Sequence, residues 1–298
     1  MIARLTDWLN RGFRHGVHPP DHKAATAAEP IRRMPFPDEV VLPLRQHAGA
    51  PARTLVKAGQ RVERGDKVGE AQGYVSVPIH ASASGTVTDV GWWPHPDGSL
   101  AEAVRIAVDP HSAQIPRPRL VPRWEDLDAD GVRAAVQDAG VVGLGGAAFP
   151  THVKLNPPEG RAVETLIVNG AECEPYLTSD HRVMVEHPER VHFGIRVMMQ
   201  CLGTSRAVIG VERNKPDAVE RLRETIPDDL DIEVIALRVK YPQGAEKMLI
   251  KAVTGREVPS GKLPIHVGTV VQNVGSIAAI AEVFETGVPL IERIVTVS

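Results

Sequence analysis

The part of the chain after residue 124 alternates short apolar runs with amphipathic stretches. The apolar runs predict buried strands at 164–168, 206–211, 232–237 and 267–271. The stretches with helical periodicity predict helices at 124–138, 179–203, 216–225, 245–253 and 275–285. Pro188 interrupts the second of these helices. Strands that alternate with helices favour an α/β fold with a mostly parallel sheet.

The region before residue 112 has a different pattern, in which glycine turns separate very short apolar runs. This pattern is typical of short strands in a small β module. The runs at 54–70 and 78–87 resemble the biotinyl/lipoyl carrier fold, a barrel-sandwich hybrid. Such carriers present a lysine on an exposed hairpin, but the corresponding stretch here, 73–77, contains none. A carrier role is therefore disfavoured, and we expect a docking or packing module.

Proline-rich stretches suggest the boundaries between these regions. Residues 14–37 are rich in His, Pro and Ala, and 110–122 are rich in Pro. We expect an N-terminal arm, a barrel-sandwich-hybrid domain, an α/β domain and the start of a further domain, at 1–37, 38–112, 113–287 and 288–298. A strand predicted at 290–297 has no partner in the sequence, so we expect the natural chain to continue past Ser298.

Charge and cysteine content narrow the class of protein. The chain has 298 residues, enough for two cores, and its net charge of -3 argues against nucleic-acid binding. Cys173 and Cys201 are the only cysteines, which excludes a disulfide framework and favours a reducing compartment. An iron–sulfur cluster needs about four thiolates, so this chain alone cannot hold a standard one.

We expect no membrane-spanning segment. The long window without Asp, Glu, Lys or Arg, 263–281, contains Pro264, Gln272 and Asn273, which a spanning helix would not bury. At the N-terminus, apolar residues lie at helical spacing, at Leu5, Trp8, Leu9 and Phe13. Two interpretations stay open there: an amphipathic helix for a membrane surface or a partner, and an unstructured terminus.

The clearest chemical signal is a loop rich in glycine. The glycine loop has the sequence Gly143-Leu144-Gly145-Gly146-Ala147-Ala148-Phe149-Pro150-Thr151. Small residues let backbone N–H groups approach a phosphate, and a short helix from Pro150 to Leu155 would add its positive end, with Lys154 one turn later. The spacing matches neither the dinucleotide-binding motif nor the P-loop. From spacing alone, an ordinary tight connection is also possible.

A second signal follows the strand predicted at 164–168. There the sequence runs Val168-Asn169-Gly170-Ala171-Glu172-Cys173-Glu174-Pro175. Ligands of open α/β sheets bind beyond the carboxyl ends of the strands. Asn169 offers a donor and an acceptor to a heterocycle, and Glu172 and Glu174 could accept from ribose hydroxyls. The alternatives are a solvated acidic turn and, with Cys173 and His181, a metal site, which no recognised ligand spacing supports.

Two further turns place polar groups at strand ends, at 240–247 and 269–275. Together with the two segments above, and in this order, they strongly resemble the RnfC family, a component of Rnf electron-transport complexes, from about Leu42 to Ser298. The core also resembles the flavin subunit of respiratory complex I. The resemblance implies an FMN-binding α/β sandwich after the barrel-sandwich hybrid, and a β-grasp-like domain beginning at 288–298.

The resemblance also implies a function and a site. It implies an FMN-dependent NADH dehydrogenase component that passes hydride to FMN and then single electrons to 4Fe-4S clusters, the flavin itself doing the chemistry. The complex would couple NADH and ferredoxin to ion transport, with this peripheral subunit on the cytoplasmic side of the membrane beside other subunits. The FMN ligands implied are Gly143, Gly145, Gly146, Lys154, Asn169, Gly244, Gln272 and Asn273. The NADH contacts implied are Phe149, Glu172 and Glu174.

The sequence departs from the complex I pattern at three positions. Ala171, Ala245 and Gln272 stand where that pattern has Asp, Glu and Asn, which puts individual NADH contacts in doubt. The cysteine-rich region of the family is also missing, so we expect the clusters in a region outside this chain. Two alternatives remain: a related flavin reductase of corrinoid cofactors, and a non-catalytic scaffold subunit as in sodium-pumping quinone reductases.

Overall fold

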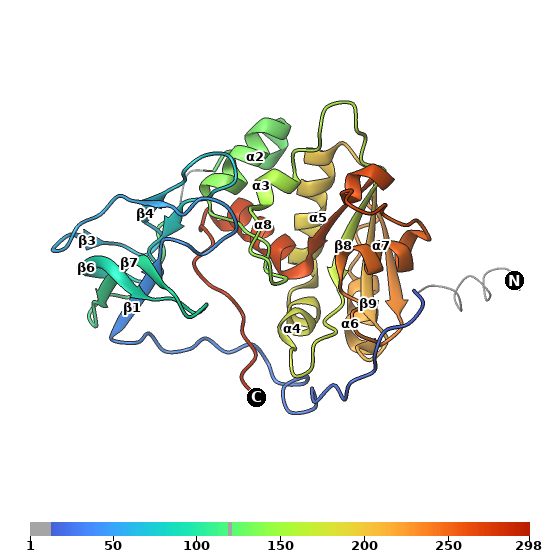
Figure 1. Ribbon diagram of the computed structural model, residues 1–298, viewed down its shortest axis with the longest axis horizontal. Helices are drawn as coiled ribbons and strands as arrows, with labels where there is room; N and C mark the ends of the chain where they lie inside the picture. Colours follow the sequence, from blue (N-terminus) through green and yellow to red (C-terminus); the bar gives the residue numbers. More distant parts are fainter. Residues whose placement is uncertain (1–12, 119–120) are drawn as a thin grey trace, which may run out of the picture. The chain divides into compact units, whose positions relative to one another are not determined.

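A computed structural model describes residues 13–118 and 121–298, and their contacts gather them into two units (Figure 1). We call the first the barrel unit; it consists of Arg32–Asn156 and Ala279–Arg293. We call the second the sheet unit; it consists of the described residues up to Ile31, Pro157–Ala278 and Ile294–Ser298. The two chain segments that contain the predicted FMN ligands thus fall into different units.

The barrel unit contains two antiparallel sheets of short strands. Four strands pair in the order β1-β7-β6-β3 and three in the order β2-β4-β5. Their bounds are β1 Glu39–Pro43, β2 Arg53–Thr54, β3 Arg61–Val62, β4 Lys67–Glu70, β5 Ile79–His80, β6 Gly85–Pro94 and β7 Leu100–Val108. Aliphatic side chains from both sheets form one core, which includes Val68, Val87 and Ile106. The predicted barrel-sandwich hybrid is confirmed.

Three short helical segments follow the strands in the barrel unit: η1 Trp124–Asp126, α2 Ala129–Asp138 and α3 Thr151–Lys154. The single helix predicted at 124–138 is divided because the Asp128 side chain accepts a hydrogen bond from the Gly131 N–H at 2.8 Å. This N-cap starts a new helix at Ala129. Gly140, with φ of +71°, follows the end of α2, as the sequence predicts.

The sheet unit is built on four parallel strands in the order β10-β9-β8-β11. The strands are β8 Thr165–Gly170, β9 Arg206–Glu212, β10 Asp231–Leu237 and β11 Thr269–Asn273. The helices are α4 Ser179–Glu186, α5 Pro188–Leu202, α6 Pro216–Glu224, α7 Glu246–Thr254, η2 Pro264–Val267 and α8 Val274–Thr286. The predicted α/β fold with a parallel sheet is confirmed, and each strand carries its polar loop at its carboxyl end.

The strand predicted at 290–297 does not form, which corrects the sequence-based expectation. A β-strand needs a neighbour for its ladder, and no described strand pairs with these residues. Side-chain contacts hold the segment instead: Glu292 pairs with Arg33 at 2.9 Å and also with Arg64. In the sheet unit, Thr296 accepts a hydrogen bond from the Thr178 N–H at 2.9 Å. The predicted amphipathic pattern, except Phe13, lies outside the described residues.

Candidate functional site

The glycine loop is a closed turn in the barrel unit. Val142 and Pro150 face each other in an antiparallel bridge at its base. The Gly143 N–H donates to the Phe149 carbonyl at 2.9 Å, which closes the loop further. Pro150, with its fixed φ, directly precedes α3 as the sequence predicts. The base of the loop is therefore held by backbone pairing, and Arg293 adds a side-chain hydrogen bond to the Leu144 carbonyl at 3.0 Å.

The tip of the glycine loop presents backbone to solvent. Residues 145–147 are exposed. The φ of Gly146 is +121°, a conformation that L side chains rarely adopt, and no heavy atom lies within 4 Å of the position of its missing Cβ. Phe149 and Lys154, which follow this tip in the sequence, are half-buried. An exposed backbone without side chains at this tip fits the phosphate of a nucleotide.

The hairpin at 73–77 supports the helix that follows the glycine loop. The Nε2 of His152 in α3 donates to the Tyr74 carbonyl at 2.8 Å, and Asn156 donates to the Tyr74 hydroxyl at 2.7 Å. In addition, the Ala48 N–H donates to the Ala148 carbonyl at 3.1 Å. Burial lowers the pKa of His152 below its usual value. The hairpin that displays a lysine in carrier proteins therefore packs against α3, as expected of a packing module.

In the sheet unit, polar side chains meet at the carboxyl ends of β8 and β11. Asn169 and Asn273 are partners in the register of these two parallel strands. The Asn169 side chain donates to the Gly244 carbonyl at 2.9 Å. The Asn273 side chain donates to Asp180 at 2.6 Å and accepts from the Ser276 N–H at 3.1 Å. The structure thus brings together three of the predicted FMN ligands: Asn169, Gly244 and Asn273.

Gly244 lies against the backbone after β8. A Cβ at this position would come within 2.8 Å of the Ala171 carbonyl oxygen, so only glycine fits without a backbone shift. The Gly244 N–H donates to the Sγ of Cys173 at 3.4 Å. Burial raises the pKa of the Cys173 thiol, which keeps it protonated at neutral pH. Gln272, another predicted ligand, is buried one residue before Asn273.

Glu172 holds the loop after β8 to the start of α4. It is buried, and its carboxylate accepts from the Ser179 hydroxyl at 3.1 Å and from the Asp180 N–H at 2.9 Å. A carboxylate at a helix N-terminus is stabilised by unpaired N–H groups and by the helix dipole. Glu174, by contrast, is exposed. Of the two glutamates predicted to contact NADH, Glu174 thus has the side chain open to solvent.

Buried charges for which the sequence gives no signal lie beside this loop. Glu212 and Lys215 are each 1% exposed and form an ion pair at 2.7 Å. Gln243 is fully buried, and its side-chain amide has no hydrogen-bond partner within the described residues. An orphaned buried amide next to Gly244 fits a polar ligand at this edge of the sheet. No spacing in the sequence distinguishes these residues from ordinary turn residues.

The N-terminal arm also reaches this edge, which the sequence did not predict. Val17 pairs with Tyr241 through two backbone hydrogen bonds of 2.9 and 2.8 Å. Lys23 is 6% exposed and donates to the carbonyls of Glu174, at 3.0 Å, and Leu177. Burial lowers the pKa of Lys23. A small cavity of about 50 Å³ is lined by His18, Pro19, Asp21, Lys23, Glu172, Cys173, Glu212, Asn214, Val239, Lys240 and Tyr241.

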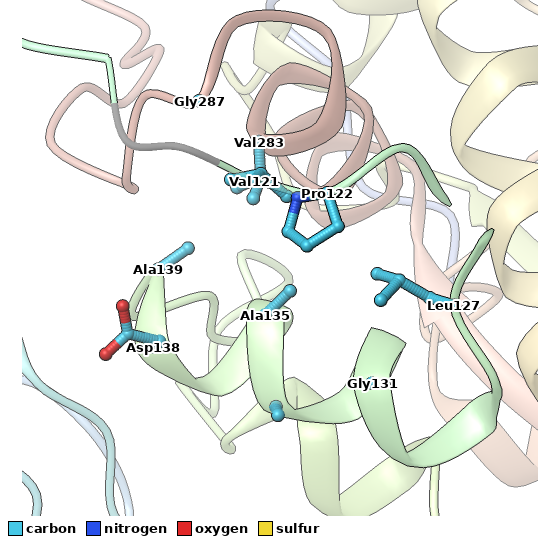
Figure 2. A pocket seen from close by; sticks show the side chains of 10 residues that line it. Val121, Pro122, Leu127, Gly131, Ala135, Asp138, Ala139, Val283 and Gly287 are labelled. Carbon is cyan, nitrogen blue, oxygen red and sulfur yellow. The ribbon is translucent and has the colours of Figure 1, made fainter. Parts of the chain in front are cut away.

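A larger cavity of about 290 Å³ lies in the barrel unit, beside α2. Figure 2 shows its walls, made by small and aliphatic side chains of α2, the linker before it and the end of α8. Asp138 supplies its one charged side chain, and that carboxylate forms an ion pair with Lys67 at 2.7 Å. None of the predicted site residues lines this cavity.

The chain matches two families of known domains. Residues 11–111 match the family described as the RnfC barrel sandwich hybrid domain. Residues 136–282 match the family described as the Nuo51 FMN-binding domain. The second match contains both the glycine loop and all four parallel strands.

Known relatives match nearly the whole chain. It is 48% identical over 284 residues to one subunit of the Na(+)-translocating ferredoxin:NAD(+) oxidoreductase complex of Acetobacterium woodii, covering 95% of this chain and 64% of the relative. It is 45% identical over 288 residues to the corresponding subunit of the proton-translocating complex of Clostridium ljungdahlii, covering 97% and 63%. The chain thus spans less than two thirds of the length of these relatives.

Among solved structures, an NAD+-reducing NiFe hydrogenase in the air-oxidized state has 27% sequence identity and a TM-score of 0.45. The match covers 55% of this chain and 31% of the hydrogenase chain. In the part of the chain that the structure describes, no helix is long and apolar enough to cross a membrane.

Proposed function

We propose that this chain is the flavoprotein component that oxidises NADH. The premise is that it belongs with the RnfC subunits of ion-translocating oxidoreductase complexes, to which it is homologous over nearly its whole length. One observation carries this proposal. The stretch that matches an FMN-binding domain contains both the bare backbone of the glycine loop and the polar carboxyl edge of a parallel sheet. These are the two features that a flavin nucleotide requires for its phosphate and its ring.

The proposal assigns FMN ligands in each unit separately. In the barrel unit, Gly143, Gly145 and Gly146 would offer backbone N–H groups to the phosphate, and Lys154 would add a positive charge. In the sheet unit, the ligands would be Asn169, Gly244, Gln272 and Asn273. When bound, FMN would supply the redox chemistry, taking a hydride and releasing electrons singly. The role of the protein is to bind and orient it, with no side chain acting as a general acid or base.

The proposal assigns NADH to the loop after β8 and to Phe149. Glu174 is exposed, so its carboxylate can accept hydrogen bonds from ribose hydroxyls. Phe149 would stack on a ring of the dinucleotide. Glu172 belongs to the same loop, but its carboxylate already binds the start of α4. Glu172 would therefore influence NADH binding by holding the loop in position.

The proposal extends to the complex. The two cysteines cannot hold a 4Fe-4S cluster, so such clusters would lie outside this chain and receive the electrons. The relatives are named as subunits of ferredoxin:NAD(+) oxidoreductase complexes that translocate protons or Na+. We therefore propose NADH, other subunits and, indirectly, ferredoxin as partners. The chain would bind peripherally on the cytoplasmic side of the membrane, where NADH is found.

The test is a visible spectrum of the purified chain with added FMN, followed by anaerobic addition of NADH. We expect a bound-flavin spectrum that bleaches on addition of NADH. A protein that binds no FMN would contradict the proposal and support a scaffold role. Bound FMN that NADH leaves oxidised would contradict the NADH assignment. Anaerobic mixing of the photoreduced flavoprotein with an oxidised corrinoid cofactor, to see whether the flavin is reoxidised, would then test the corrinoid reductase alternative.

A further inference from the structure

Residues 13–31 of the N-terminal arm belong to the sheet unit and are hydrogen-bonded to the rest of it along their course. Val17 pairs with Tyr241, and the Tyr176 N–H donates to the Asp21 carbonyl at 2.8 Å. Farther along, Arg182 in α4 donates to the Ala27 carbonyl at 3.0 Å. The Ile31 N–H donates to Glu186 at 3.0 Å. An arm with hydrogen bonds to two loops and to one helix is part of the folded unit, although it contains no helix or strand of its own.

Lys23 is a charged residue of the arm that is buried in the sheet unit. Its ammonium group donates to the carbonyls of Glu174 and Leu177. Glu172 and Glu212 favour its positive charge, whereas Lys215 and burial oppose it. A buried ammonium is costly unless it is hydrogen-bonded and paired with opposite charge. An apolar side chain would fill the same space at lower cost, so packing alone does not explain a lysine here.

The loop that Lys23 binds is held in a strained conformation. Tyr176 has φ of +70°, which a non-glycine residue adopts only when its surroundings impose it. The contacts that impose it come largely from the arm: the hydrogen bond to Asp21, and His22, whose ring stacks on that of Tyr176 with centroids 5.0 Å apart. Meanwhile the side chains of Glu174, Tyr176 and Leu177 remain exposed. The arm therefore fixes the backbone of the loop and leaves its side chains open to a ligand.

We propose that Lys23 is a positioning residue that holds the 172–177 loop, and with it Glu174, in the conformation that binds NADH. The proposal rests on the function proposed above, because it takes the loop to be part of the NADH site. Removing the ammonium would leave two carbonyls without their donor and the acidic pair Glu172 and Glu212 without one of its positive neighbours. The loop would then sample conformations in which Glu174 is displaced.

The test compares Lys23→Met with Lys57→Met, a matched substitution at an exposed lysine of the barrel unit. Three quantities are measured on the full chain: FMN content, hydrogen exchange of the amides at 173–178, and the NADH concentration that half-bleaches the flavin. We expect Lys23→Met to keep its FMN, to exchange faster at 173–178, and to need ~10-fold more NADH or higher, because small displacements of a binding group have large effects. Lys57→Met should match the wild type in all three.

Two results would overturn the proposal: unchanged exchange at 173–178 in Lys23→Met, or faster exchange with an unchanged NADH requirement. If Lys23→Met does not fold, Lys23→Ala, which also removes the donor and the charge, is judged by the same two criteria. Hydrogen exchange needs no NADH. If wild-type FMN is not bleached, the proposed function fails and the proposed role of Lys23 in NADH binding fails with it, while exchange still shows whether Lys23 holds the loop.

Discussion

The glycine loop and the carboxyl edge of the sheet have opposite constructions. The loop is closed by backbone pairing, and its tip at 145–147 offers little besides backbone. The sheet edge is cross-linked by side chains: Asn169 to Gly244, Asn273 to Asp180, and Lys23 to the loop after β8. A phosphate is bound well by bare N–H groups, whereas a heterocycle needs side chains in fixed places. We therefore expect substitutions at the tip of the glycine loop to lower FMN affinity, and substitutions at the sheet edge to lower the stability of the fold first.

The largest effect is expected at the tip of the glycine loop. Gly145→Val would place a branched side chain where, in the proposed site, the FMN phosphate approaches the backbone, and we expect FMN affinity to fall by roughly 100-fold or more. Because residue 145 is exposed, the fold should be retained. Equilibrium dialysis with FMN measures the affinity, and circular dichroism checks the fold.

Gly91→Ala, whose new Cβ would lie nearest to the side chain of Asp89, is the control and should bind FMN normally. Full flavin occupancy in Gly145→Val would show that the phosphate lies elsewhere, and the contrast between the two regions would lose its functional meaning.

At the sheet edge the same kind of substitution should act on stability first. The Cβ of Gly244→Ala would press on the Ala171 carbonyl, and forcing such a contact typically costs ~1–3 kcal/mol. Urea denaturation followed by circular dichroism measures the loss. An unchanged midpoint would mean that this edge is as adaptable as the glycine loop.

Glu172→Gln tests whether Glu172 holds the loop after β8 in position or contacts NADH directly. The neutral amide loses the charge that faces the start of α4, and we expect a loss of about 1 kcal/mol. The same urea titration measures it, alongside NADH titration of the bound flavin. A loss of NADH affinity at unchanged stability would contradict the positioning role and favour direct contact with NADH.

The smallest effect concerns His152, which packs behind the glycine loop. Its folded-state pKa is lowered by burial, so below about pH 6.5 the unfolded chain takes up a proton that the folded chain does not. The stability of the barrel unit should therefore fall as pH drops from 6.5 toward the folded pKa. Fluorescence of Trp92, Trp93 and Trp124, all in the barrel unit, follows unfolding.

His152→Gln should flatten this pH dependence, whereas the exposed His111→Asn should leave it unchanged. An equally steep slope in His152→Gln would assign the dependence to other groups.

The sequence predicted the elements of the fold well, because periodicity and glycine stops report on local structure. The four parallel strands and the end of α2 near Gly140 are examples. It failed at 290–297, where apolar spacing suggested a strand but no neighbour was available for a ladder. Strand formation depends on a partner that local pattern does not reveal.

The candidate site was predictable only in part. Asn169, Gly244 and Asn273 come together as the resemblance implies. Asn169 and Asn273 lie at the carboxyl ends of two paired strands, and Gly244 lies in a turn between a strand and a helix of the same sheet unit. Lys23 and Gln243 gave no signal, since their roles come from burial and from contacts across long stretches of sequence. Local composition marked the arm as extended, but it carried no information about what the arm binds.

The arm has a consequence for the order of events during synthesis. Phe13 and Lys240, which touch in the folded protein, are 227 residues apart in the chain. At a synthesis rate of ~5–20 residues per second, the arm leaves the ribosome roughly 10 to 45 s before its last contacts exist. Docking of the arm therefore has to wait until the turn that contains Lys240 has been synthesised.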